Sequence, residues 1–128
     1  MADRIKLIVL DEVDSTNNYL RHYQGEEGER MTIALADFQT AGQGQGEHVW
    51  ESERGKNLTF SIKCYPKGLS AARQFVMLEA GALAIRDALE RYSNDITIKW
   101  PNDIYCRDYK ISGTLSECSV TSAGIRHC

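Results

Sequence analysis

The sequence has no long hydrophobic run, and this absence excludes a large class of proteins. No apolar stretch approaches the roughly 20 residues that a membrane-spanning helix needs. The first residues, from Met1 onward, also lack the apolar core of a secretory signal. We therefore expect a cytoplasmic protein that does not bind a membrane.

Basic residues are too few for general binding of nucleic acid. The 128 residues include 15 lysines and arginines against 18 aspartates and glutamates, so the formal net charge at pH 7 is −3. Nucleic-acid binders usually carry a basic patch and a basic balance. Nothing ahead of Ile5 could form a helix-turn-helix either, so the sequence predicts no DNA-binding domain and no DNA partner.

Several familiar reaction centres are missing as well. The four cysteines are far apart and include no C-x-x-C pair, which argues against a zinc site. The three histidines form neither a triad nor a metal-binding pattern, and there is no serine nucleophile elbow. No Gly-Lys-Ser/Thr follows the glycine-rich segment, so that segment is not a Walker loop.

Hydrophobic patterning predicts more strands than helices. Ser15 offers an N-cap for a short helix over 16–23, and Ser70 offers one for a long helix with apolar residues every three or four positions. This stripe, typical of a helix packed on a sheet, consists of Phe75, Leu78, Ala82, Ile85 and Leu89. Strands are predicted over 5–10, 31–38, 58–64, 96–100, 104–106 and 110–118, and a long mobile loop over 40–55.

These elements predict the fold class α+β, with a mixed, mainly antiparallel sheet and helices packed on one face. Only the long helix is expected to act as a crossover between strands, and residues 1–128 are interpreted as one domain. The strand pattern ends at Cys118, and no helix or closing element is expected in 119–128. We therefore expect a chain that is shortened at its C-terminus.

The first chemical motif, Asp14-Ser15-Thr16-Asn17, lies where the short helix should begin. Ser15 can cap this helix, which is its simpler role. The positive end of the helix dipole can also receive a carboxylate or a ureido group. The motif alone does not decide between these roles.

The second motif runs from Gln39 through Thr40-Ala41 and the glycine-rich Gly42-Gln43-Gly44-Gln45-Gly46 towards Trp50. Glycine permits backbone conformations that bring several N–H groups against an anion. The alternative is a flexible surface loop, which is what glycine clusters more often indicate.

The third motif is Lys99-Trp100-Pro101-Asn102-Asp103, with Lys110 a few residues behind it. Asp103 could bind Mg²⁺ or accept a hydrogen bond from a nucleotide, and the alternative is an ordinary turn. Lys110 either meets an anion, gaining about 4 kcal/mol at roughly 4 Å and a dielectric of about 20, or faces solvent at a strand start. The residues alone do not decide between these roles.

In this order and at this spacing, the three motifs resemble the catalytic core of the biotin–protein ligases. Segments 11–20, 36–62 and 98–117 look like consecutive blocks of that core. The resemblance implies a class II synthetase-like, biotin–lipoate ligase-like fold with ATP and Mg²⁺ as cofactors and biotin as substrate. It also implies a biotin carboxyl carrier protein of acetyl-CoA carboxylase as partner, with a homodimer as one option. The glycine-rich strand and the SH3-like C-terminal domain of the family would lie beyond Cys128.

The resemblance also implies a role for each motif residue. Lys110 is the catalytic residue, since it would contact both the biotin carboxylate and the α-phosphate, and Asp103 would bind the metal. The other implied biotin-binding residues are Ser15, Thr16, Asn17, Gln39 and Gly42. The implied nucleotide-binding residues are Gln43, Gly44, Gln45, Trp50, Asn57, Asn102 and Asp103.

The resemblance leaves alternatives and one departure. Family loops often carry arginines where this chain has Gln43 and Gln45, so we expect Lys110 to bear more of the phosphate charge. A lipoate or octanoate ligase is an alternative hypothesis for an enzyme, because its domain has a related architecture. A third hypothesis is a catalytically inactive fragment that binds ligand weakly or pairs with another chain.

Overall fold

The computed structural model describes residues 4–128 and divides into two compact units. Unit 1 comprises Met1–Pro66 together with His127–Cys128, and unit 2 comprises Lys67–Arg126.

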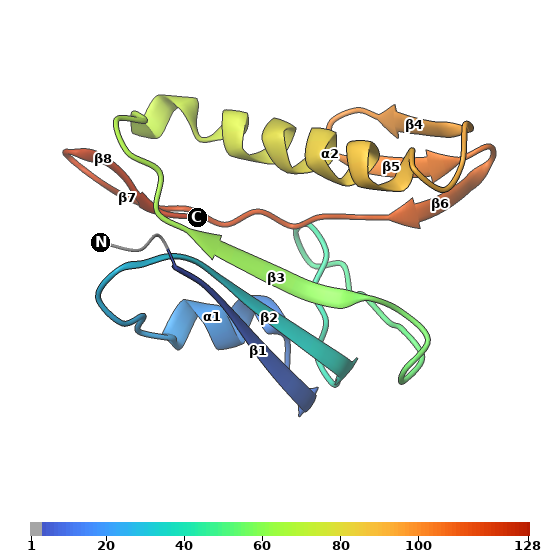
Figure 1. The fold of residues 1–128 in the computed structure, drawn as a ribbon, viewed down its shortest axis with the longest axis horizontal. Helices are drawn as coiled ribbons and strands as arrows, with labels where there is room; N and C mark the ends of the chain where they lie inside the picture. The colour runs from blue at the N-terminus through green and yellow to red at the C-terminus, as the bar shows by residue number, and fades with distance from the viewer. Residues whose placement is uncertain (1–3) are drawn as a thin grey trace. The chain divides into compact units, whose positions relative to one another are not determined.

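Unit 1 begins with a β-α-β arrangement (Figure 1). Strand β1 (Arg4–Val13) runs parallel to β2 (Glu29–Gln39), and β2 pairs antiparallel with β3 (Thr59–Cys64). Helix α1 (Thr16–His22) lies in the connection between the two parallel strands. The prediction that only the long helix is a crossover is therefore wrong. A parallel pair needs a connection of about a dozen residues or more, and the short helix with its flanking loops supplies it.

The two faces of this sheet differ in side-chain size and exposure. On β2, Thr32, Ala34 and Ala36 are almost fully buried, and α1 contacts β2 and β3. Their small side chains allow the close approach of a helix. On the other face, Leu7 and Val9 of β1 are 58% and 67% exposed. The buried face of the sheet is therefore the one that positions α1.

A buried lysine fixes the C-terminal end of α1. Lys63 of β3 is only 8% exposed, and its Nζ donates to the carbonyl oxygens of Leu20 at 2.9 Å and Tyr23 at 3.0 Å. The Leu20 carbonyl also accepts from the backbone N–H of Tyr23 at 3.2 Å. The last carbonyls of a helix carry its partial negative charge, and the Lys63 ammonium group offsets this charge.

Replacing Lys63 by methionine should therefore destabilise unit 1. The change keeps most of the side-chain volume but removes two charge-assisted hydrogen bonds, so we expect the free energy of unfolding to fall by about 2 kcal/mol. Urea denaturation followed by circular dichroism measures this change. The exposed Lys67→Met serves as the control and should lie within about 0.5 kcal/mol of the parent. A Lys63→Met protein as stable as the parent would contradict this role.

Unit 2 is a helix packed on a three-stranded antiparallel sheet. After the 3₁₀ turn η1 (Ala71–Arg73), helix α2 (Phe75–Leu89) precedes the strands β4 (Ile96–Lys99), β5 (Asp103–Cys106) and β6 (Tyr109–Ser112). Ala82 of α2 forms a core with Ile96 and Ile104, and Ile85 and Leu89 pack against it. The predicted apolar stripe of the helix is thus confirmed at Ala82, Ile85 and Leu89. Phe75, at the start of the predicted stripe, is 40% exposed.

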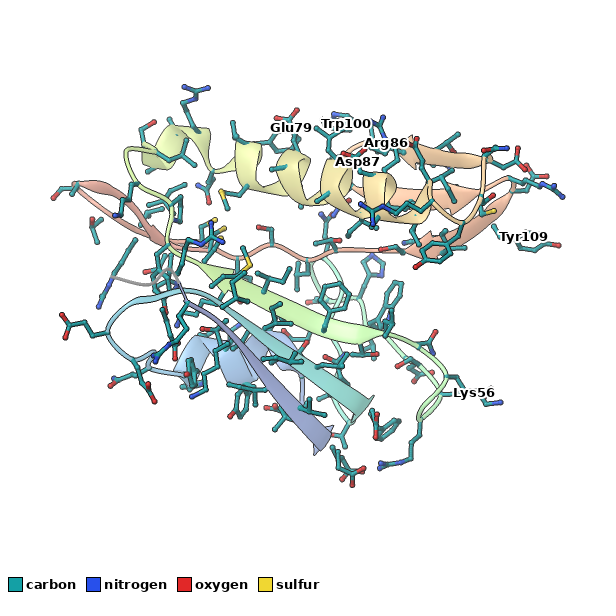
Figure 2. The ribbon with its side chains drawn as sticks, viewed as in Figure 1. Lys56, Glu79, Arg86, Asp87, Trp100 and Tyr109 are labelled. Carbon is teal, nitrogen blue, oxygen red and sulfur yellow. The ribbon has the colours of Figure 1, made fainter. Side chains whose placement is uncertain are left out.

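Two predicted boundaries in unit 2 are wrong. Ser70 makes no capping hydrogen bond and precedes η1, so it does not begin α2. The sixth strand ends at Ser112 instead of Cys118. There the side chain of Asn102 donates to the carbonyl of Thr114, which diverts that carbonyl from a strand ladder. At the other end of β6, Tyr109 is 76% exposed and extends outward (Figure 2).

The last residues do contain a closing element, contrary to the sequence prediction. Strands β7 (Ser119–Thr121) and β8 (Gly124–His127) form a two-stranded sheet. The turn uses Gly124 at φ 118°, where a Cβ would lie 2.5 Å from the carbonyl oxygen of Leu69. Cys128 then exchanges two backbone hydrogen bonds with Cys64, of 2.8 and 2.9 Å. Such short strands carry little apolar periodicity, which explains why the pattern gave no signal.

The predicted fold class is confirmed, since helices combine with one parallel and several antiparallel strand pairings. The strands described in residues 4–128 lie in three sheets instead of one. Within the same residues, neither helix is long and apolar enough to cross a membrane.

Candidate functional site

The N-terminus of α1 is held by two side chains of the first motif. Ser15 is 4% exposed, and its Oγ accepts a hydrogen bond from the backbone N–H of Asn18 at 3.0 Å. The capping role of Ser15 is therefore confirmed. Asp14 accepts from the backbone N–H of Ser15 at 2.7 Å and from the side-chain amide of Asn18. These hydrogen bonds, that of Ser15 first, lower the pKa of the Asp14 carboxyl.

The lowered pKa of Asp14 predicts a loss of stability in acid. Because the folded pKa lies below the ordinary value of 3.8, the stabilisation is complete above that value and disappears as the pH falls through the folded pKa. The substitution Asp14→Asn keeps an acceptor for Ser15 but cannot titrate. Urea denaturation at a series of pH values should show its largest deficit above about pH 5 and a shrinking deficit below about pH 4. The same deficit at every pH would contradict this account.

Thr16 is the centre of a hydrogen-bond network that joins α1 to β2 and β3. Its backbone N–H and its Oγ1 both donate to Oε1 of Gln39, at 2.8 and 3.1 Å. Its Oγ1 lies 2.6 Å from Oγ of Ser61, which also donates to Oδ1 of Asn17. Thr16 and Ser15 are both nearly buried, so their polar atoms are held firmly. Three of the predicted biotin-binding residues are thus connected to one another.

The glycine-rich segment folds back on itself as a narrow hairpin. The backbone N–H of Trp50 donates to Gly42 at 2.9 Å, and that of Gly44 donates to His48 at 2.8 Å. Gly42 is buried, and a Cβ there would lie 2.3 Å from the carbonyl oxygen of Trp50 and 2.8 Å from Nε2 of Gln39. Only glycine fits this position, and the hairpin is therefore tied closely to the Thr16–Gln39 network.

Most of the predicted nucleotide-binding residues of unit 1 are exposed. They are Gln43, Gln45, Trp50 and Asn57, with Gly44 half-buried between the first two. Trp50 retains 39% exposure. Arg54, a basic residue that the sequence interpretation did not use, pairs with Asp11 at 3.2 Å and lies over the Phe38 ring at 5.0 Å. This arginine fixes the segment that follows the hairpin, and Lys56 beyond it extends outward (Figure 2).

In unit 2 the third motif forms the turn between β4 and β5. The Trp100–Pro101 peptide bond is cis, and Asn102 is 4% exposed with its amide donating to Thr114. Asp103 opens β5, and its Oδ1 lies 3.3 Å from Nζ of Lys110 on β6. The side chain of Lys110 is 39% exposed, so this lysine pairs with a carboxylate at the surface and is not buried in an apolar strand.

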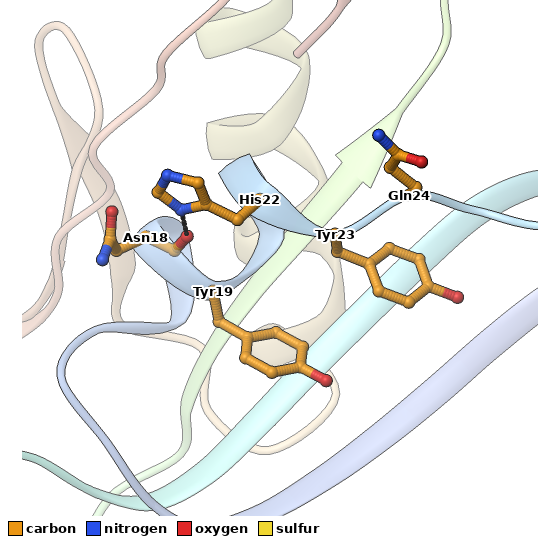
Figure 3. Close-up of a pocket in the computed structure, with 5 residues that line it drawn as sticks. All are labelled: Asn18, Tyr19, His22, Tyr23 and Gln24. Atoms are coloured by element: carbon orange, nitrogen blue, oxygen red, sulfur yellow. Dashed lines mark hydrogen bonds between the residues drawn. The ribbon is translucent and has the colours of Figure 1, made fainter.

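A shallow depression of about 340 Å³ on α1 is a weaker candidate. It is lined by Asn18, Tyr19, His22, Tyr23 and Gln24. Figure 3 shows that these side chains diverge, since the two tyrosine rings point to one side and His22 and Asn18 to the other. Nδ1 of His22 lies 3.0 Å from the carbonyl oxygen of Asn18 in its own helix. Polar groups do not converge there on a common point, as a binding pocket requires.

The sequence of the chain is similar to those of one protein family over nearly its whole length. Residues 9–127 match the sequence pattern of the biotin/lipoate A/B protein ligase family. The chain belongs to this family. The bifunctional ligase/repressor BirA of Escherichia coli is 35% identical over 110 residues, which are 85% of this chain and 34% of that protein. The chain thus spans about a third of the length of this curated relative.

Two solved structures of biotin protein ligases are similar to the fold. The Leishmania major enzyme, in complex with biotinyl-5-AMP, has a TM-score of 0.76 and 27% identity, over 95% of this chain and 54% of that chain. The Aquifex aeolicus enzyme, in complex with biotin and ATP, has a TM-score of 0.72 and 33% identity, over 95% of this chain and 50% of that chain. These proteins therefore share the fold of this family member over nearly its whole length.

The residues of this family member fit a magnesium ion only if a nucleotide brings most of its ligands. Within the described residues 4–128, no three His, Cys, Asp or Glu side chains are grouped to hold a metal. Asp103 offers one carboxylate. Mg²⁺ is usually bound through one or two carboxylates together with water and substrate phosphates. A single protein carboxylate is therefore compatible with this ion.

Sequence reasoning missed Ser61 in the hydrogen-bond network of Thr16 and Gln39. Its only signal is its position on β3, two residues before Lys63 on the same face of the strand. A serine within a strand gives no pattern of its own. Its partners Thr16 and Asn17 lie more than forty positions away in the sequence, so only the fold brings them together.

Proposed function

We propose that this chain carries the biotin-activating core of a biotin–protein ligase. It binds biotin and ATP, forms biotinyl-5′-AMP, and passes the biotinyl group to a lysine of a biotin carboxyl carrier protein of acetyl-CoA carboxylase. The observation that carries the proposal is the Thr16–Gln39 network beside the Gly42 hairpin. The ligands named for the similar Leishmania and Aquifex structures support it.

In unit 1 the proposal assigns recognition of the biotin head group to the buried end of α1. A ureido group donates through two N–H groups and accepts through one carbonyl oxygen. The hydroxyl and amide groups at this end both donate and accept, so they match that pattern. The assigned residues are Ser15, Thr16, Asn17, Gln39 and Gly42. Gln43, Gly44, Gln45, Trp50 and Asn57 are assigned to the nucleotide.

In unit 2 the proposal assigns the phosphate charge to Lys110. Its ammonium group already lies beside a carboxylate, and an anionic ligand can replace or share this ion pair. Asn102 and Asp103 are assigned to the nucleotide, and Asp103 would hold Mg²⁺ that arrives with ATP. When bound, Mg²⁺ reduces the negative charge of the phosphates.

The reaction needs no covalent nucleophile from the protein. A carboxylate oxygen of biotin attacks the α-phosphorus, the bond to pyrophosphate breaks, and a mixed anhydride remains. The amine of the carrier lysine then attacks the acyl carbon, and AMP leaves. The tasks of the chain are positioning, which can supply about 7–11 kcal/mol, and charge neutralisation by Lys110. The cytoplasmic location, a possible homodimer and the single-domain interpretation of 1–128 stay predictions.

A lipoate or octanoate ligase is the second candidate function, because the matched family includes both substrate classes. Calorimetric titration of the chain with biotin and with lipoate, each with and without ATP and Mg²⁺, separates the two. The proposal predicts that biotin binds at least about tenfold more tightly than lipoate. Tighter binding of lipoate than of biotin would contradict the proposal and favour a lipoate or octanoate ligase. Binding of biotin without any product would favour the inactive fragment.

A further inference from the structure

We infer that Ser61 on β3 is a positioning residue for the biotin head group, acting through Thr16. This inference rests on the proposed function and adds a third element to the residues of α1 and β2. Ser61 belongs to none of the three sequence motifs.

The position of Ser61 follows from the register of the sheet. Ser61 pairs with Ala34 of β2, which is fully buried on the face that carries α1. The small alanine side chain leaves α1 close to β3, and Ser61 Oγ lies 2.6 Å from Oγ1 of Thr16. The same oxygen donates to Oδ1 of Asn17. One hydroxyl thus joins two consecutive residues of the first turn of α1.

The two hydroxyl protons of this network can be arranged in opposite directions. In one direction Thr16 donates to Ser61, and Ser61 donates to Asn17. In the other direction Ser61 donates to Thr16, which then donates to Gln39. Each hydroxyl has only one proton, so these directions exclude each other.

The second direction, in which Ser61 no longer donates to Asn17, prepares Thr16 to bind a carbonyl oxygen. When Ser61 occupies the acceptor side of Thr16 Oγ1, the Thr16 proton must point towards Gln39 or towards a ligand. Oε1 of Gln39 meanwhile keeps the hydrogen bond from the backbone N–H of Thr16. A ureido oxygen can therefore receive the Thr16 proton without leaving Gln39 unpaired. Ser61 thus sets the donor direction without touching the ligand.

The test compares three variants of the full chain in two measurements. Ser61→Ala removes the hydroxyl, Ser61→Thr restores it, and Thr59→Ala removes a hydroxyl two positions away on the same face of β3. Calorimetry measures the affinities for biotin and for ATP separately. Hydrogen exchange measures the protection of the backbone amides at 16–18 without any ligand.

We expect Ser61→Ala to bind biotin roughly tenfold more weakly, with ATP affinity within about twofold of the parent and faster amide exchange at 16–18. Ser61→Thr should restore both properties, and Thr59→Ala should resemble the parent. Parental biotin affinity and exchange in Ser61→Ala would overturn the inference. An equal loss of biotin and ATP affinity that Ser61→Thr does not restore would also overturn it, since it indicates a general structural role.

The two measurements also separate this inference from the proposed function. If the parent chain binds no biotin but Ser61→Ala still exchanges faster at 16–18, the proposed function fails while the positioning of the helix turn by Ser61 stands. If the parent binds biotin and Ser61→Ala changes neither measurement, the function stands and Ser61 has no positioning role.

Discussion

Formation of biotinyl-5′-AMP is expected to fall by about a thousandfold when Lys110 is replaced by alanine. The transition state places extra negative charge on the phosphate oxygens, and the proposal assigns its neutralisation to the Lys110 ammonium. The expectation is stronger here because Gln43 and Gln45 carry no charge in the glycine-rich hairpin. Single-turnover measurement of the adenylate by mass spectrometry checks the rate.

Two controls distinguish loss of chemistry from loss of fold. The Lys110 side chain is 39% exposed, so Lys110→Ala should keep the circular dichroism spectrum and melting temperature of the parent. Lys67→Ala removes an exposed lysine of the same unit and should leave the rate unchanged. A Lys110→Ala protein that makes the adenylate at the parental rate would refute the catalytic assignment.

Replacing Gly42 by alanine should have the second largest effect. The added Cβ would lie 2.3 Å from the backbone oxygen of Trp50, a distance that real Cβ atoms do not show. The hairpin must therefore shift, and it takes with it the hydrogen bond from Trp50 N–H to Gly42. Overpacking of this kind costs about 1–3 kcal/mol. Because the shifted hairpin borders the assigned biotin site, we expect the affinity for biotin to fall by up to about a hundredfold, which corresponds to about 3 kcal/mol. Calorimetry measures this affinity.

Two other glycines provide a graded comparison with Gly42. A Cβ at Gly44 would lie 3.1 Å from Cβ of His48, an overlap that a shift of a few tenths of an ångström relieves, so Gly44→Ala should weaken binding less. Gly81 lies within α2 with open space around its Cβ position. Gly81→Ala should stabilise the helix by about 0.5–1 kcal/mol and leave binding unchanged. Equal biotin affinity in Gly42→Ala and the parent would contradict the steric argument.

The sequence predicted best where the cause is local. The cap at Ser15, the short helix behind it and the turn at Pro101 each depend on neighbours within a few positions, and each is present in the structure. The stripe of α2 was predictable because a period of three to four residues survives along one helix.

Features that depend on distant residues were not predictable from patterning. The short helix was predicted, but not the parallel pairing of β1 and β2 that it connects, because patterning does not fix the direction in which two strands pair. In the sequence, Lys63 is only a polar position within a strand. The fold brings its ammonium group within hydrogen-bond distance of the carbonyl oxygens of Leu20 and Tyr23. The contact of Lys110 with Asp103 depends on the register of β5 and β6, which apolar periodicity does not fix.

The most direct test of the proposed function is the detection of biotinyl-5′-AMP. The purified chain is mixed with biotin, ATP and Mg²⁺, with lipoate in a parallel reaction, and the products are identified by mass spectrometry. The account predicts biotinyl-5′-AMP with biotin, little lipoyl adenylate, and formation of biotinyl-5′-AMP that is about a thousandfold slower in the Lys110→Ala chain. No adenylate from either acid, or an adenylate from lipoate alone, would contradict the account.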